Sequence, residues 1–151
     1  MNYSNQIKMR LGALLVLSVI AAFLMVSVYA KTSDQTEQPD QIEQLINDKV
    51  KNNKVVVFSK SYCPYCARAK GLLKSLSVKA EILELDQRED GQKIQSTLYE
   101  KFTKSRTVPS IWFDGKWFGG SDKLMQSLQD GTLYGTLKEA NIEFVPEKSE
   151  L

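Results

Sequence analysis

The sequence predicts a small α/β sandwich in which a four-stranded mixed sheet is flanked by helices. Short runs of β-branched and aromatic residues alternate with segments whose apolar residues recur at helical spacing. An Asp-Gly pair between two apolar runs, Asp114-Gly115, indicates a hairpin. Strands joined through a helix are expected to be parallel and hairpin strands antiparallel, so the predicted sheet is mixed.

The first half of the domain alternates helices and strands. Apolar residues at helical spacing predict a first helix at Ile42, Leu45, Ile46 and Val50. The run Val55 to Ser59 is typical of a buried strand. A second helix is predicted by Ala69, Leu72, Leu73 and Leu76. A second strand holds Ile82, Leu83 and Leu85 and ends at Asp86.

The second half begins with a helix and continues with the hairpin. Ile94, Leu98 and Phe102 recur every four residues and predict that helix. The hairpin covers Ser110 to Phe118. The remaining apolar residues predict a helix at Leu124, Met125 and Leu128, stopped by Gly131, and a last one over Leu133 to Ala140.

Composition excludes several classes of protein. Of 151 residues, 42% are hydrophobic and 25% charged, which is typical of a folded domain rather than a disordered chain or a multi-span membrane protein. The 20 basic and 18 acidic residues leave no long basic run, which argues against nucleic-acid binding. The chain has no histidine, which excludes serine–histidine triads and histidine bases.

The N-terminus is expected to be a targeting segment. Residues 1–10 form a basic region with Lys8 and Arg10, and Leu11–Ala30 carries no charge. At about 1.5 Å per residue a helix of that length reaches about 30 Å, enough to cross a bilayer. It is either a signal peptide cleaved after Val28-Tyr29-Ala30 or a retained transmembrane anchor. Either way, the rest of the chain is translocated and the basic flank stays cytosolic.

Three further segments complete the expected organisation. Residues 31–40 are a polar linker with Pro39, residues 41–146 are the folded domain, and residues 147–151 are a charged tail. The tail ends Lys148-Ser149-Glu150-Leu151, which differs at one position from the Lys-Asp-Glu-Leu retention signal. We therefore expect the domain in the lumen of the endoplasmic reticulum or secretory pathway.

The chemistry is predicted at Cys63-Pro64-Tyr65-Cys66, between the first strand and the second helix. A cysteine at a helix start is stabilised as thiolate by free N–H groups and the helix dipole, and Lys60 adds positive charge. Cys66 lies three residues on, close enough for a disulfide, which suits thiol–disulfide exchange. The alternatives are half of a zinc site or an inert structural disulfide.

Two other segments flank the expected site. Thr107-Val108-Pro109 precedes the hairpin, where a cis Val108–Pro109 bond would leave an open edge for an extended peptide. Gly119-Gly120-Ser121-Asp122 precedes a helix, with Ser121 or Asp122 as its N-cap, and a helix start there would attract a ligand carboxylate.

Together these motifs resemble glutaredoxin, over about 100 residues. The resemblance implies a thioredoxin-like fold and a glutathione-dependent thiol–disulfide oxidoreductase acting on glutathionylated proteins, with glutathione as co-substrate and no metal. It implies that Cys63 is the nucleophile, Cys66 the resolving thiol and Cys63–Cys66 the redox disulfide. The implied glutathione contacts are Lys60 and Gln95 to the glycine carboxylate, Tyr65 along the groove, Thr107 and Val108 to the tripeptide backbone, cis Pro109, and Ser121 and Asp122.

Two positions depart from the family pattern, and two other functions compete with it. Asp122 comes one residue before the family's acid, whose place Lys123 takes, and the Lys101–Arg106 loop is one residue longer. The competing functions are a glutathione-ligated iron–sulfur carrier and a thioredoxin-like oxidase or isomerase of protein disulfides. We expect a monomer, and we expect Trp112 and Trp117 to pack on the hairpin rather than to bind substrate.

Overall fold

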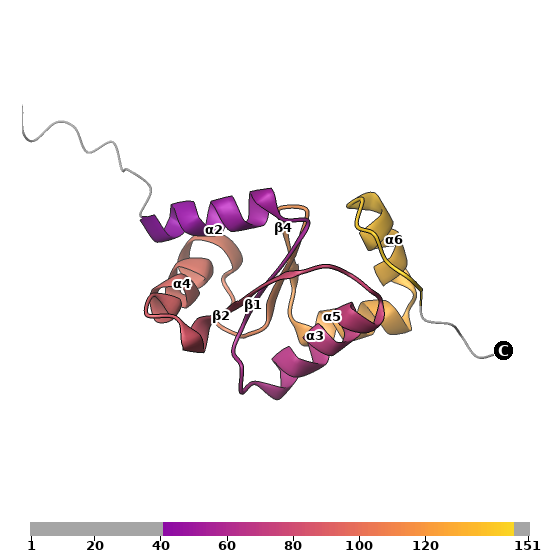
Figure 1. Cartoon of the computed structure of the whole chain (residues 1–151), viewed down its shortest axis with the longest axis horizontal. Helices are drawn as coiled ribbons and strands as arrows, with labels where there is room; N and C mark the ends of the chain where they lie inside the picture. The colour runs from indigo at the N-terminus through magenta and orange to yellow at the C-terminus, as the bar shows by residue number, and fades with distance from the viewer. Residues whose placement is uncertain (1–40, 147–151) are drawn as a thin grey trace, which may run out of the picture. The chain divides into compact units, whose positions relative to one another are not determined.

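The computed structural model describes residues 41–146. The expected signal or anchor segment Leu11–Ala30, the linker and the tail lie outside them. No helix within residues 41–146 is long and apolar enough to cross a membrane. The elements, in chain order, are α2 (Gln41–Asn52), β1 (Val55–Ser59), α3 (Pro64–Ser75), β2 (Glu81–Glu84), the 3₁₀ turn η1 (Leu85–Gln87), α4 (Gly91–Thr97), the π-helical segment η2 (Leu98–Thr103), β3 (Ser110–Phe113), β4 (Lys116–Gly119), α5 (Ser121–Gln129) and α6 (Thr132–Glu139) (Figure 1).

The four strands form one mixed sheet in the order β2-β1-β3-β4. β1 is parallel to β2, with Val57 opposite Ile82 and Ser59 opposite Glu84. β1 is antiparallel to β3, and β3 is antiparallel to β4. The predicted mixed sheet is therefore confirmed, including the parallel first pair that a helical crossover requires.

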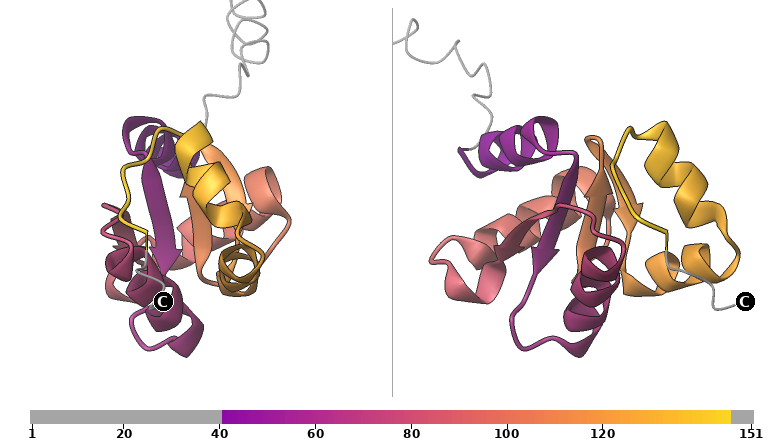
Figure 2. Two further views of the ribbon diagram at one scale, coloured as in Figure 1. Left: turned by 90° about the vertical axis from the view of Figure 1, so that its right-hand side faces the viewer. Right: turned by 45° about the vertical axis from the view of Figure 1, so that its right-hand side comes forward.

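The alternation of side chains along β1 divides the interior into two cores. Val55 and Val57 face α3, α5 and α6, whereas Val56 and Phe58 face α2 and α4. Figure 2 shows the strands running between these two groups of helices. Because both faces of β1 are covered, its five residues are all buried, which is why its sequence is a continuous apolar run.

The hairpin has the turn that its sequence predicts. Asp114 and Gly115 have φ angles of +47° and +75°, and two positive values in succession make a turn whose twist matches the flanking strands. Glycine reaches this region at no steric cost, and aspartate tolerates it better than most residues. The turn is held to β1 by a hydrogen bond from the Asp114 N–H to the Lys54 carbonyl, at 2.8 Å.

Two local expectations were wrong. The second strand ends at Glu84 rather than Asp86, because Leu85 turns into η1, where its side chain still reaches the core beneath α2 and α4. α5 ends at Gln129 and is stopped by Gly131 as predicted, since Gly131 is left-handed and its N–H donates to the Leu128 carbonyl at 3.2 Å, but its N-cap is Gly120 rather than Ser121 or Asp122. Glycine adopts the extended N-cap conformation without providing a side-chain bond.

The predicted helix through Ile94, Leu98 and Phe102 changes type along its length. It is α-helical to Thr97 and then widens into η2. The Thr103 hydroxyl donates to the Leu98 carbonyl five residues back, at 3.1 Å, and Lys104 ends the segment in the left-handed conformation. A spacing of four residues does not distinguish the two helix types, so the sequence predicted the buried face but not the wider turn.

Candidate active site

Cys63 is the N-cap of α3, as predicted from its position between strand and helix. Its backbone is extended and Pro64 follows at the first helical position. The Cys63 N–H donates to the Lys60 carbonyl at 3.1 Å, and its own carbonyl accepts from the Ala67 N–H at 3.0 Å. Pro64 has no N–H to leave unpaired in the first turn, so the sequence suits a helix that begins here.

The surroundings of Cys63 favour its thiolate. Desolvation would raise the pKa of the thiol, but it is outweighed by hydrogen bonding from the Cys66 and Tyr65 backbone and the Cys66 side chain, and by the charge of Lys60. The net effect lowers the pKa of Cys63 below its ordinary value. Free N–H groups of a first helical turn have this effect on a thiolate at the cap.

Cys66 lies one turn into α3 and is fully buried. Desolvation raises the pKa of its thiol, although the Lys60 N–H and the Ser59 hydroxyl act in the opposite direction. The Cys66 sulfur accepts from the Lys60 N–H at 3.5 Å. Both cysteines are free thiols: Cys63 is partly buried with a lowered pKa, and Cys66 is buried with a raised one.

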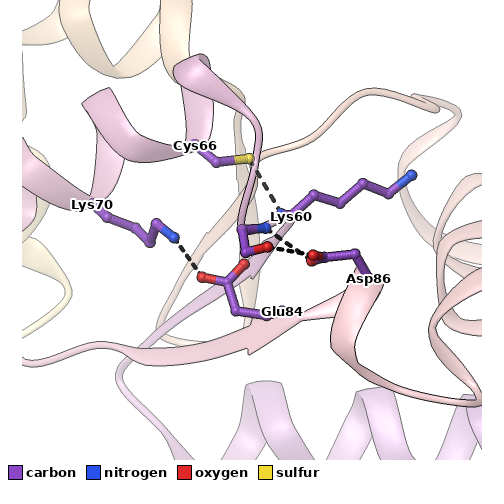
Figure 3. Close-up of polar contacts among 6 residues, drawn as sticks. Lys60, Cys66, Lys70, Glu84 and Asp86 are labelled. Carbon is purple, nitrogen blue, oxygen red and sulfur yellow. Dashed lines mark hydrogen bonds and ion pairs between the residues drawn. The ribbon is translucent and has the colours of Figure 1, made fainter.

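The turn between β1 and Cys63 is held by a residue that the sequence analysis did not assign to the site. Asp86, in η1, accepts from the Ser61 N–H at 2.8 Å and also from the Ser61 hydroxyl (Figure 3). These two hydrogen bonds lower the pKa of Asp86. Because β1 and β2 are parallel, the residues that follow them meet at one edge of the sheet, and this rule was the available signal for Asp86.

A groove of about 450 Å³ lies beside Cys63. Tyr65, Thr107, Val108 and Pro109 line it, and the Val108–Pro109 bond is cis, as the resemblance implied. The Cys63 thiol approaches the Val108 carbonyl at 3.8 Å. Tyr65 is half exposed at 51%. Cys63 is therefore in contact with Val108, one of the residues that line a groove large enough for an extended peptide.

The same groove is bounded by the start of α5. Its lining there comprises Gly119, Gly120, Ser121, Asp122 and Lys123. The Ser121 hydroxyl is buried and has no hydrogen-bond partner among residues 41–146. Lys123 rests its amine 5.2 Å from the centre of the Phe118 ring. This wall of the groove thus contains a helix start, the unpaired Ser121 hydroxyl, and the opposite charges of Asp122 and Lys123.

The two tryptophans behave differently. Trp112 packs in the core between Phe58 and Phe102, with edge-on ring contacts at centroid distances of 6.4 and 5.9 Å. Trp117 is 42% exposed and lines the groove. The expectation of hairpin packing is therefore confirmed for Trp112 only. Trp117 and Lys123 are groove residues that the sequence analysis did not place there.

Lys60 and Gln95, expected to bind one carboxylate together, are not among the residues that line this groove. The Lys60 side chain extends away from Cys66 in Figure 3. The Gln95 amide donates to the Arg106 carbonyl at 2.7 Å and lines a separate hollow with Tyr99 and Arg106. Within the described part of the chain, no three His, Cys, Asp or Glu side chains gather as a metal-binding group.

Comparison with known proteins bears on this arrangement. The family model described as Glutaredoxin matches residues 55–118, which contain both cysteines and the hairpin. A buckwheat glutaredoxin solved in complex with glutathione is 40% identical, with a TM-score of 0.65, over 71% of this chain and 96% of that one. Glutaredoxin C1 from Populus tremula x tremuloides, solved in a holo form, is 36% identical, with a TM-score of 0.64, over 67% and 99% of the two chains.

Curated relatives agree with the structural neighbours. Glutaredoxin-C8 of Oryza sativa subsp. japonica is 48% identical over a stretch that makes up 58% of this chain and 65% of that relative's length. Glutaredoxin-C4 of Arabidopsis thaliana is 36% identical over 115 residues, which are 76% of this chain and 83% of the relative. The thioredoxin-like fold expected from the resemblance is confirmed, and the chain belongs to the glutaredoxin family.

Proposed function

We propose that this chain is a glutathione-dependent thiol–disulfide oxidoreductase that removes glutathione from protein–glutathione mixed disulfides. The observation that carries the proposal is the Cys63 thiol, which lies at a helix start, has a lowered pKa and approaches Val108 in the wall of a peptide-sized groove. The partly exposed Cys63 thiol, with its lowered pKa, distinguishes this site from a structural disulfide, whose cysteines are buried and unreactive.

In the first step the Cys63 thiolate attacks the glutathione sulfur of the substrate. A Cys63–glutathione disulfide forms, the original disulfide breaks, and the substrate leaves as a thiolate that takes a proton from water. The lowered pKa of Cys63 increases the fraction of its thiol that is present as the attacking thiolate. The Val108 carbonyl, which the thiol faces, marks the side from which the glutathione sulfur enters.

The mixed disulfide is resolved by one of two routes. A second glutathione attacks the bound glutathione sulfur, giving glutathione disulfide and free Cys63. Alternatively, Cys66 attacks the Cys63 sulfur, giving the Cys63–Cys66 disulfide and glutathione, and two further glutathione molecules then reduce that disulfide. The first route needs only Cys63, whereas the second needs both cysteines.

The groove provides the contacts for the glutathione part of the substrate. Thr107 and Val108 present backbone groups to the tripeptide, and Tyr65 closes one side. At the other end, the start of α5 and the unused Ser121 hydroxyl suit the γ-glutamyl carboxylate, with Asp122 beside its amine. Lys60 and Gln95, outside this groove, are assigned to the glycine carboxylate.

The test is selectivity for the glutathione group. One cysteine-containing peptide is prepared as the mixed disulfide with glutathione and, as the matched control, with free cysteine. We expect turnover at least about tenfold faster on the glutathione form, which corresponds to about 1.4 kcal/mol of groove contacts. Equal rates on both forms, with faster reduction of an internal protein disulfide, would contradict the proposal and favour a thioredoxin-like reductase.

We also propose that the domain acts in the lumen of the endoplasmic reticulum or secretory pathway. Support comes from the uncharged Leu11–Ala30 stretch behind Lys8 and Arg10, and from the tail Lys148–Leu151. A lumenal potential of roughly −180 to −210 mV lies near that of glutaredoxins, so exchange there runs in either direction.

Protease protection tests this location. The full chain, tagged within its folded domain, is expressed in cells from which microsomes are prepared. We expect the domain to be protected until detergent is added, and deletion of residues 148–151 to increase its escape from the endoplasmic reticulum. Digestion in intact microsomes would overturn the topology. Unchanged retention after the deletion would instead assign retention to the hydrophobic stretch.

A further inference from the structure

The Cys66 thiol needs an acceptor for its proton, and the groove beside Cys63 does not provide one. To attack a mixed disulfide on Cys63, Cys66 must lose its proton, yet its side chain is fully buried and desolvation raises its pKa. Because the groove lies on the Cys63 side, bulk water does not receive this proton directly. A proton acceptor inside the protein is therefore needed next to Cys66.

The space beneath Cys66 contains buried polar groups with unused hydrogen-bonding capacity. Ser59 and Glu84 are register partners at the ends of β1 and β2, and their side chains project from the face of the sheet that α3 covers. Within residues 41–146, the Ser59 Oγ and the Glu84 Oε2 atoms are buried; Glu84 Oε2 has no hydrogen-bond partner, and the Ser59 hydroxyl has none but the neighbouring Cys66 sulfur, whose pKa it lowers. Buried polar atoms are rarely left unpaired, so these two require an explanation.

Lys70 places the Glu84 carboxylate on the same side as the thiol. Lys70 follows Cys66 by four residues and therefore lies on the same face of α3. Its amine pairs with the Glu84 Oε1 atom, which leaves Oε2 free, and Figure 3 shows Lys70 reaching Glu84 on the side from which Cys66 also projects. The side chains of Lys70 and Glu84 are 23% and 21% exposed, so the carboxylate spans from the interior to solvent.

We propose that a buried water bridges the Ser59 Oγ and Glu84 Oε2 atoms beneath Cys66, and that Glu84 is the proton acceptor when Cys66 resolves the mixed disulfide. This inference rests on the proposed function, in which Cys66 is the resolving thiol. A buried water typically makes about three hydrogen bonds, and Ser59, Glu84 and the Cys66 sulfur provide three polar partners. β2 is an edge strand, so Glu84 releases the proton to solvent from its exposed side.

The Cys66 sulfur forms a bond to the Cys63 sulfur, and the bond between Cys63 and glutathione breaks. The Cys66 proton passes through the bridging water to the Glu84 carboxylate, while glutathione leaves as a thiolate and takes a proton from solvent. The two cysteines are oxidised and the bound glutathione is reduced, so no further oxidant is required after the mixed disulfide has formed.

The test measures closure of the disulfide in single turnovers. The reduced full chain is mixed with excess glutathione disulfide, quenched with acid at successive times, and weighed by mass spectrometry to separate the mixed disulfide from the closed form. We expect Glu84→Gln to slow closure by about 100-fold, the low end of what a positioned proton acceptor contributes, so that the mixed disulfide accumulates. Ser59→Ala is expected to slow it as well, by a smaller factor.

Lys70→Met is the matched control, because it breaks the same ion pair but leaves the carboxylate in place. We expect it to close faster than Glu84→Gln. Equal slowing in both variants would make the pair merely structural and overturn the inference, as would closure of Glu84→Gln at the wild-type rate. If Glu84→Gln does not fold, as thermal unfolding will show, Ser59→Ala decides by the same criterion.

A second readout separates this inference from the function on which it rests. The Glu84→Gln effect on turnover must disappear when Cys66 is replaced by serine, because the acceptor acts only through that thiol. An effect that persists without Cys66 would overturn the inference. Failure of the wild-type chain to remove glutathione from the peptide would instead overturn the proposed function.

Discussion

The two cysteines lie three residues apart and yet occupy different physical environments. Cys63 caps α3 at the edge of a groove, where backbone N–H groups and Lys60 lower its pKa. Cys66 is sealed beneath the same helix, where desolvation raises its pKa. A single helical turn therefore separates a thiol stabilised as an anion from a thiol stabilised as neutral.

The position of each cysteine along α3 gives it a different chemical environment. The helix start supplies stabilisation only to its first residues, since the dipole effect falls off within one turn. Beyond it the helix packs on the sheet, so burial dominates. On this basis we propose that Cys63 attacks and Cys66 resolves.

The largest expected effect is on turnover. Cys63→Ser should abolish removal of glutathione from a glutathionylated peptide, because serine is not ionised near neutral pH. Cys66→Ser should retain activity, because free glutathione resolves the mixed disulfide on Cys63. Steady-state rates at fixed glutathione concentration check this. Equal loss in both variants would show that the reaction depends on the dithiol route.

The next effect is on stability, with aspartate as a permanent anion at each position. Cys66→Asp should lose about 3–5 kcal/mol of unfolding free energy, because it buries a charge without a partner. Cys63→Asp should lose nothing and gain about 1 kcal/mol, because aspartate is a favoured N-cap. Urea denaturation measures both changes in unfolding free energy, and Cys66→Ala and Cys63→Asn are the uncharged control variants. Similar losses at both positions would remove the contrast between the two environments.

Much of the fold could be predicted because its signals are local. The apolar run of β1, the Asp114-Gly115 turn and the helical spacing of Ile94 and Leu98 each reflect burial or backbone geometry within a few residues. The widening of η2 could not be predicted, because it depends on which carbonyl each backbone N–H reaches, as where the Lys104 N–H donates to the Tyr99 carbonyl five residues back. The end of β2 and the N-cap of α5 were predicted wrongly for the same reason, since they depend on hydrogen bonds rather than on periodicity.

The same distinction between local and long-range contacts applies to the residues of the site. Cys63 at a helix start was predicted, because the strand, the cysteine and Pro64 are adjacent in sequence. Asp86, Glu84 and Trp117 were not assigned to the site, because each reaches it through strand pairing across many residues. The cysteine at the helix start could therefore be located from the sequence, but not the side chains that neighbouring strands bring to it.

A smaller effect is expected on the reactivity of Cys63. Lys60→Gln should move the midpoint of iodoacetamide alkylation to higher pH, because one positive charge beside the thiolate is lost. The midpoint should remain below that of an ordinary cysteine, since the hydrogen bonds from the helix start persist. Lys70→Gln is the control, because that amine pairs with Glu84. An unchanged midpoint in Lys60→Gln would show that the helix start alone sets the pKa of Cys63.

The smallest expected effect concerns the turn that carries Cys63. The hydrogen bonds from Ser61 lower the pKa of Asp86. These bonds are therefore fully formed above the ordinary carboxyl pKa, and they are lost only as the pH falls through the lower pKa of the folded state. The amide proton of Ser61, which Asp86 accepts, reports this directly. Its NMR shift should titrate below about 3.9, the ordinary aspartate value, and stop titrating in Asp86→Asn. A midpoint at or above that value would show that Asp86 does not hold the turn, which would leave Cys63 positioned by α3 alone.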